Sequence, residues 1–99
     1  MNVKIMIKFK IYSRTVKANN GNVFTAYRVY SKDGKKTMDA KFTRESGFKD
    51  PGVSDFYVYA NEEDVNVSRT GRYPVMWFRS VDHIEKIEKE AEDFSEYAY

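Results

Sequence analysis

The chain has 99 residues, which is enough for one compact domain and too few for two independent ones. It contains no cysteine, and this excludes a disulfide scaffold, a thiol nucleophile and a zinc site with cysteine ligands. A hydrophobic content of 41% and an aromatic content of 16% are sufficient for a folded core. With no signal-peptide organisation and no stretch of ~20 apolar residues, we expect a soluble, cytoplasmic protein without a membrane partner.

The net charge of +2 conceals a strong asymmetry between the two halves of the chain. Residues 1–49 hold 12 Lys and Arg against 3 Asp and Glu, a net charge of +9, whereas residues 50–99 hold 5 against 12, a net charge of −7. Such asymmetry indicates a polyanionic partner for the basic half, an acidic tail, or both. The alternative is that the two halves simply neutralise each other in the folded protein.

The segment 3–17 alternates between apolar and polar side chains with a period of two. Apolar residues occupy every second position from Val3 to Ile11, and most positions between them are lysines. At helical spacing the isoleucines and lysines would mix on every side, so the period favours a β-strand. The sequence therefore predicts a long strand with one apolar face and one basic face.

Two turn signals divide the following residues into a three-stranded meander. Asn20-Gly21 and Asp33-Gly34 favour hairpin turns, because these residue types tolerate positive φ. Residues 23–31 between the turns are rich in β-branched and aromatic side chains, and residues 37–43 alternate again. We expect antiparallel strands at 3–17, 23–31 and 37–43.

The second half of the chain predicts a loop, two further strands and a terminal helix. Residues 44–54 contain Pro51-Gly52 and are expected to form the loop. Residues 55–59 are expected to form a strand. Residues 65–67 either continue this strand or pair locally. The last strand is expected at 73–81, with Pro74 at its start or on an edge. Beyond it, the spacing of Ile84, Ile87 and Ala91 predicts a short helix over 82–93, capped by Asp82.

Five strands in about 80 residues are typical of a small barrel or a sandwich. We expect an all-β domain over residues 1–93, a five-stranded barrel of the oligonucleotide-binding (OB) type with a short C-terminal helix. Residues 94–99 then form an acidic, aromatic C-terminal tail. The OB fold usually places an additional element between its third and fourth strands, where residues 44–54 fall.

No catalytic or cofactor-binding constellation emerges from the sequence. The single histidine, His83, is better explained as a capping or surface residue than as part of a relay. The acidic run Glu62-Glu63-Asp64 lacks the alternate spacing and central glycine of a calcium loop. The five glycines are scattered singly, so there is no phosphate-binding loop. We therefore expect no enzymatic activity, no cofactor and no metal site.

The informative pattern is a mixture of cations and aromatic rings on one side of the expected meander. Single-stranded nucleic acid binds to such a mixture, because phosphates pair with Lys and Arg and unpaired bases stack on flat rings. Alternation places Trp77 either in the core or on this platform. The candidate nucleic-acid-binding residues are Lys8, Lys10, Tyr12, Arg14, Arg28, Tyr30 and Lys41 on the strands, and Lys35 and Lys36 in the second turn.

In four features the chain resembles the OB-fold single-stranded DNA-binding proteins of bacteria and phages. They are a lysine-rich first strand leading to an Asn-Gly turn (KANNGN, 17–22), a Tyr/Arg second strand (TAYRVYS, 25–31), a final strand with a Trp (PVMWFRSV, 74–81), and an acidic tail ending in aromatics. The resemblance implies a non-catalytic protein that oligomerises and coats exposed single strands, with single-stranded DNA as the favoured ligand.

Two other classes stay open at the level of sequence. The acidic C-terminal half suits a small protein–protein interaction module, such as an accessory or inhibitor protein of a phage or mobile element, acting on basic protein partners. An exposed β edge that pairs with a second copy would give a homo-oligomer. The basic and aromatic face itself has a simpler explanation, in which tyrosines cover apolar surface and lysines keep the sheet soluble.

Overall fold

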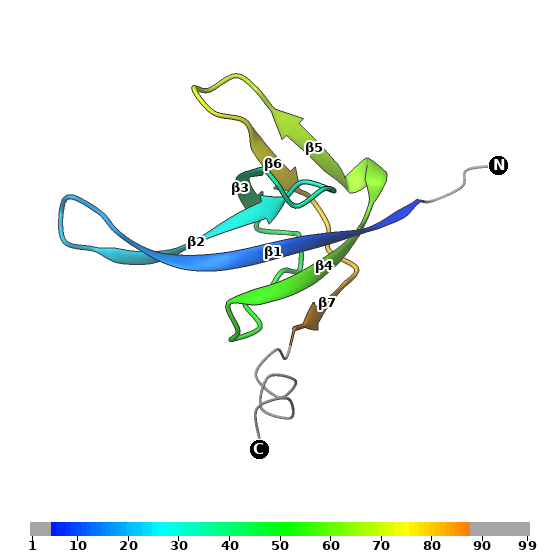
Figure 1. Cartoon of the computed structure of the whole chain (residues 1–99), viewed down its shortest axis with the longest axis horizontal. Helices are drawn as coiled ribbons and strands as arrows, with labels where there is room; N and C mark the ends of the chain where they lie inside the picture. The colour runs from blue at the N-terminus through cyan, green and yellow to red at the C-terminus, as the bar shows by residue number, and fades with distance from the viewer. Residues whose placement is uncertain (1–4, 88–99) are drawn as a thin grey trace, which may run out of the picture.

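The computed structural model of the chain describes residues 5–87, and this range is all-β without an α-helix (Figure 1). It follows that none of the described residues form a helix able to cross a membrane. The elements are β1 (Met6–Lys17), β2 (Val23–Tyr30), β3 (Thr37–Phe42), β4 (Asp55–Asn61), the 3-10 turn η1 (Glu62–Asp64), β5 (Val65–Ser68), β6 (Val75–Phe78) and β7 (His83–Lys86).

The seven strands form one mixed sheet in the order β5-β6-β3-β2-β1-β4-β7. All neighbours are antiparallel except β3 and β6, which are parallel. The expected all-β class is confirmed, but the sheet is open by its hydrogen bonds and has seven strands where five were expected. One reason is that η1 divides the stretch from 55 to 68 into β4, which pairs with β1, and β5, which pairs with β6.

The second reason is that the predicted helix over 82–93 is wrong where the structure describes it. His83–Lys86 form β7 on the free edge of β4, with Ile84 paired to Val58 of the core. The Asp82 carboxylate contacts the His83 ring at 2.6 Å and caps no helix. Pairing with an existing sheet satisfies the backbone and covers Val58, and this tertiary gain outweighs the helical spacing of the isoleucines. The rest of the predicted helix and the tail lie outside the described residues.

The core is built on the face that the alternation of β1 predicted. Ile11 lies opposite Val29 on one side and Phe56 on the other, and the exposed fractions of the three side chains are 0%, 2% and 0%. Paired residues of neighbouring strands share a face of the sheet, so Ile11, Val29 and Met38 lie on one face, whereas Ile5 and Val23 at the strand ends are 54% and 62% exposed. The buried core consists of Ile11, Val29, Ala40, Phe56, Val58, Ala60 and Phe78.

The loop between β3 and β4 covers one side of this core. Phe48 stacks on Phe42 with ring centroids 3.7 Å apart and an interplanar angle of 7°, and Phe42 in turn stacks on Phe78. Ser46 is buried, and its carbonyl accepts a hydrogen bond from the Val81 amide. The loop is thereby anchored by aromatic packing and by backbone bonds to the end of β6 and the residues that follow it.

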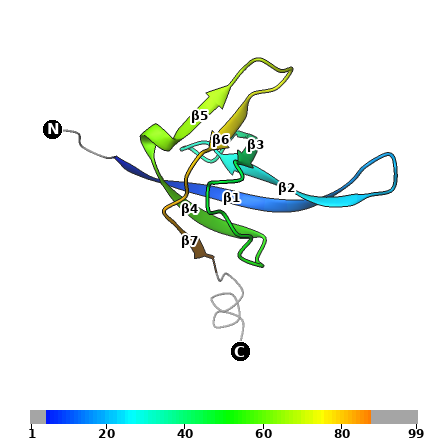
Figure 2. The same cartoon turned by 180° about the vertical axis from the view of Figure 1, so that it is seen from behind.

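The β1–β2 hairpin is longer than the strands beside it. β4 pairs with β1 only as far as Tyr12, and β3 pairs with β2 only from Tyr27 onward. Residues 13–26 therefore project as a two-stranded ribbon, plainly visible from both sides of the molecule (Figures 1 and 2). Near its tip Val23 and Phe24 are 62% and 51% exposed.

Replacing Phe56 by alanine tests this description of the core. Phe56 is fully buried, so Phe56→Ala should lower the free energy of unfolding by about 3–5 kcal/mol. The matched control is Phe24→Ala on the ribbon, where a change of about 0.5 kcal/mol or less is expected. Urea unfolding followed by circular dichroism measures both, and equal losses in the two variants would contradict the core assignment.

Candidate nucleic-acid interface

The face of the sheet opposite the core, here called the outer face, collects the predicted strand residues. Tyr12 lies opposite Arg28, which in turn lies opposite Asp39, so these three side chains share the outer face. The same register fixes the neighbouring rows from β7 to β6. The outer face includes Lys8, Lys10, Tyr12, Arg14, Phe24, Ala26, Arg28, Tyr30, Asp39, Lys41, Tyr57, Tyr59, Trp77, His83 and Glu85.

On the outer face, lysine ammonium groups lie over aromatic rings. The Lys8 Nζ lies 4.0 Å from the centroid of the Tyr57 ring, and the Lys10 Nζ lies 5.3 Å from that of Tyr30. Tyr12 and Tyr30 are in ring contact, with centroids 5.2 Å apart. These distances fall within the range of cation–π and aromatic pairs, so the cations and the rings form one interleaved surface.

Lys8 and Lys10 border a hollow of about 680 Å³ that also contains Tyr30, Tyr57 and residues of the β2–β3 turn. A side-chain hydrogen bond with Tyr59 raises the pKa of Lys8 above its usual value, and the nearby Glu85 carboxylate, 3.9 Å away, acts in the same direction. Lys8 is therefore charged at neutral pH. The Tyr59 ring stacks on His83 with centroids 4.1 Å apart, which extends the aromatic surface onto β7.

Lys35 and Lys36 lie in the β2–β3 turn and are exposed. The turn is ordered by Asp33, whose Oδ1 accepts hydrogen bonds from the Ser31 hydroxyl at 2.5 Å and the Lys35 amide at 2.9 Å. These two bonds lower the pKa of the Asp33 carboxyl. Gly34 at φ 75° supplies the left-handed residue that the turn requires.

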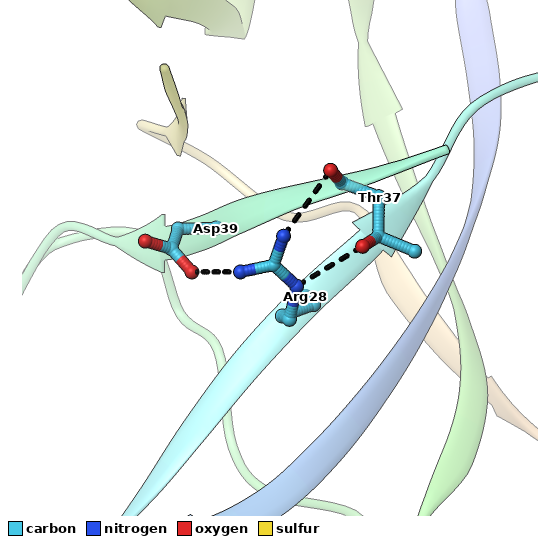
Figure 3. A network of polar contacts seen from close by, with 3 residues as sticks. All are labelled: Arg28, Thr37 and Asp39. Carbon is cyan, nitrogen blue, oxygen red and sulfur yellow. Dashed lines mark hydrogen bonds and ion pairs between the residues drawn. The ribbon is translucent and has the colours of Figure 1, made fainter. Parts of the chain in front are cut away.

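Among the predicted cations, Arg28 makes a closer and less exposed ion pair than the Lys8–Glu85 pair. Its Nη1 donates to Asp39 Oδ1 at 2.6 Å, its Nε donates to the Thr37 hydroxyl at 3.1 Å, and its Nη2 donates to the Thr37 carbonyl at 3.2 Å (Figure 3). The sequence did not predict the pairing of Asp39 with Arg28. Arg28 thus braces β2 against β3, and most of its positive charge is balanced locally.

A second hollow, which the sequence did not single out, lies at the foot of the ribbon. It has a volume of about 690 Å³ and is lined on its outer-face side by Arg14, Phe24, Ala26, Lys41 and Trp77. Trp77 lies opposite Lys41, and the Lys41 Nζ is 5.7 Å from its ring centroid. The two alternatives for Trp77 are thereby decided: it is a half-buried residue of the outer face. The alternation of side chains along each strand was the sequence signal that could have placed Phe24 and Trp77 on the outer face.

The described residues contain no group of three His, Asp or Glu side chains placed to hold a metal ion. The acidic run Glu62-Glu63-Asp64 forms η1, where the amide of Glu62 donates to the Ile5 carbonyl and Arg79 donates to the Glu63 carbonyl. The His83 ring contacts the Asp82 carboxylate and stacks on Tyr59, at the edge strand.

Comparisons with protein-family models, with curated proteins and with solved structures find no match for this chain.

Tyr27 lines the second hollow from the core side of the sheet and provides a pH test. Burial, reinforced by its 2.7 Å hydrogen bond to Asp50 Oδ2, raises the pKa of the Tyr27 phenol from 10.0 to about 12. Between these values the folded protein retains a proton that the unfolded chain loses, so stability falls as pH rises through this window.

Tyr27→Phe removes this titration and should flatten that part of the stability profile. Urea midpoints measured in steps from pH 9 to about 12 provide the comparison, with the wild type losing more stability than the variant. Tyr73→Phe, at an exposed tyrosine, is the matched control and should follow the wild type. Superimposable profiles for Tyr27→Phe and the wild type would contradict the assigned pKa.

Proposed function

We propose that the protein is a non-catalytic single-stranded nucleic-acid-binding protein with an OB-like fold, and that single-stranded DNA is its favoured ligand. The observation that carries the proposal is the outer face, on which Lys8, Lys10 and Lys41 each lie over an aromatic ring. Ammonium groups neutralise phosphates and release condensed counterions, while exposed rings stack on unpaired bases.

Strand connectivity supports the OB-like part of the proposal. When β4, η1 and β5 are counted as one bent strand, its first part pairs with β1 and its last part pairs with β6. The order then becomes β1-β2-β3-β6-β5/β4-β1, a five-membered ring that the chain itself closes through η1. In the OB fold the face of strands 2 and 3 and the loops beside it bind oligonucleotides, and the hollow at the ribbon lies there.

The side chains divide into three roles under this proposal. Lys8, Lys10, Arg14, Lys41 and the turn residues Lys35 and Lys36 hold phosphates. Tyr12 and Tyr30 stack on bases, at ring distances suited to two successive contacts. Arg28 holds the platform in shape through Asp39 and Thr37, and contributes less to phosphate binding than its exposed neighbours.

A single strand fits this surface better than a duplex does. Readout of a duplex needs a helix or a β-ribbon that enters the major groove with base-reading side chains. The projecting ribbon carries Arg14 and Lys17 as its only charged residues, and the lysine–tyrosine contacts lie on the body of the sheet. A surface of lysines and half-buried rings is suited to bases that are already unpaired.

Salt dependence of binding tests the proposal. Labelled oligo-dT should bind at about 50 mM salt and lose affinity steeply by about 200 mM, with a slope near −0.7 per phosphate contacted. Lys10→Gln with Lys41→Gln should reduce that slope by about 1.4. The matched control, Lys49→Gln with Lys86→Gln, removes two exposed lysines away from the outer face and should leave the slope unchanged.

Stacking is tested separately from charge. Tyr12→Leu with Tyr30→Leu retains apolar bulk but removes both rings, and should weaken oligo-dT binding about tenfold or more at constant salt slope. Fluorescence anisotropy measures the affinity. An absence of binding at low salt in the wild type would refute the proposal and favour the protein-interaction module.

A further inference from the structure

Ala26 makes a depression in the outer face at the foot of the ribbon. It lies opposite Arg14 of β1, and Lys41 of β3 lines the same groove. Phe24 precedes it on the same face. A methyl group surrounded by three long side chains leaves a hollow, and Ala26 is among the residues that line the 690 Å³ groove.

The groove is open on the side where a neighbouring strand would otherwise lie. Val23–Ala26 pair with β1, whereas the β2–β3 ladder begins only at Tyr27. The volume lies within the ~300–1,000 Å³ typical of small-ligand sites, and the lining is mostly apolar with few charged groups. Phe24 and Trp77 supply aromatic walls, and Arg14 and Lys41 supply positive charge at the rim.

Asp39 gives this hollow a chemical preference. It lines the same groove and lies diagonally next to Ala26, because it pairs with Arg28, the next outer-face residue of β2. Its Oδ1 accepts from Arg28, which holds the carboxylate in place. An ionised carboxylate only accepts hydrogen bonds and has capacity for about four, so it favours a ligand edge that presents N–H groups.

We propose that the hollow over Ala26 binds one unstacked nucleobase that carries an exocyclic amino group at C4 or C6, so that cytosine and adenine are preferred over uracil and thymine. The inference rests on the proposed function and adds base selectivity to it. Phe24 and Trp77 enclose the base, Lys41 and Arg14 hold the flanking phosphates, and Asp39 accepts the amino hydrogens. Uracil and thymine present a carbonyl oxygen at the same position, which a carboxylate repels.

Oligo-dC and oligo-dU of equal length form the matched probe pair, because their bases have the same size and differ at the amino and carbonyl group. At one fixed salt concentration the wild type should bind oligo-dC about tenfold more tightly. Asp39→Asn presents an amide that also donates hydrogen bonds, and should reduce the ratio to about one or invert it. The ratio remains informative even when loss of the Arg28 pair changes overall affinity.

Filling the hollow is the second test. Ala26→Leu should abolish the preference for oligo-dC while the salt slope stays unchanged, because no charge is removed. Ala18→Leu, at the tip of the same ribbon and outside the groove, is the control and should retain the wild-type ratio. Circular dichroism confirms folding of each variant before its affinities are measured.

The outcomes separate the inference from the function on which it rests. Salt-dependent binding of both oligonucleotides with equal affinity would overturn base selectivity and leave the proposed function standing. A ratio that persists in both Ala26→Leu and Asp39→Asn would place the selectivity elsewhere and also overturn the inference. Failure of the wild type to bind either oligonucleotide would overturn both.

Discussion

Ile11 is enclosed by Val29 on one side and by Phe56 on the other, and this three-residue row sets the register of the central strands. Side chains on a strand alternate with a period of two, so a slip of one residue would exchange the core for the solvent face. Burial of this row therefore also determines which residues point outward. The cations and rings of the outer face share one side of the sheet because the isoleucine, valine and phenylalanine occupy the other.

The sequence contained most of the local information about the meander, and little about the contacts between distant segments. Alternation and two hairpin signals were sufficient to predict β1, β2, β3 and their faces. The parallel pairing of β3 with β6 joins residues about 36 positions apart, and no periodic pattern in the sequence predicts this pairing. Over the described residues 82–87, the helix prediction failed because Ile84 suits both periods, and only the edge of β4 decides between them.

The sequence was sufficient to predict which residues share the outer face. It was not sufficient to predict the ion pair of Arg28 or the groove at the ribbon. The period-two alternation of side chains within each predicted strand was sufficient to place Lys8, Lys10 and Lys41 on one face. Whether Arg28 is a free cation depends on Asp39 and Thr37, whose positions follow from the β2–β3 register. The groove at the ribbon depends on where β3 stops pairing with β2. At that end of β3, Phe42 stacks on Phe48 and Phe78, and these tertiary contacts cannot be predicted from local sequence.

The Arg28–Asp39 pair lies between the two hollows of the outer face. This arrangement bears on how a single nucleic-acid strand would cross the face. One hollow contains Lys8, Lys10 and Tyr30, and the other contains Ala26. Tyr30 and Ala26 are four residues apart on β2, a separation of about 13 Å along the strand. A flexible polyanion that spans this distance would meet cations and aromatic rings at both ends. Between them it would meet the Arg28–Asp39 pair, which is nearly neutral. Under the proposed function, the centre of the face would position the nucleic acid by shape, while its two ends would provide the charge.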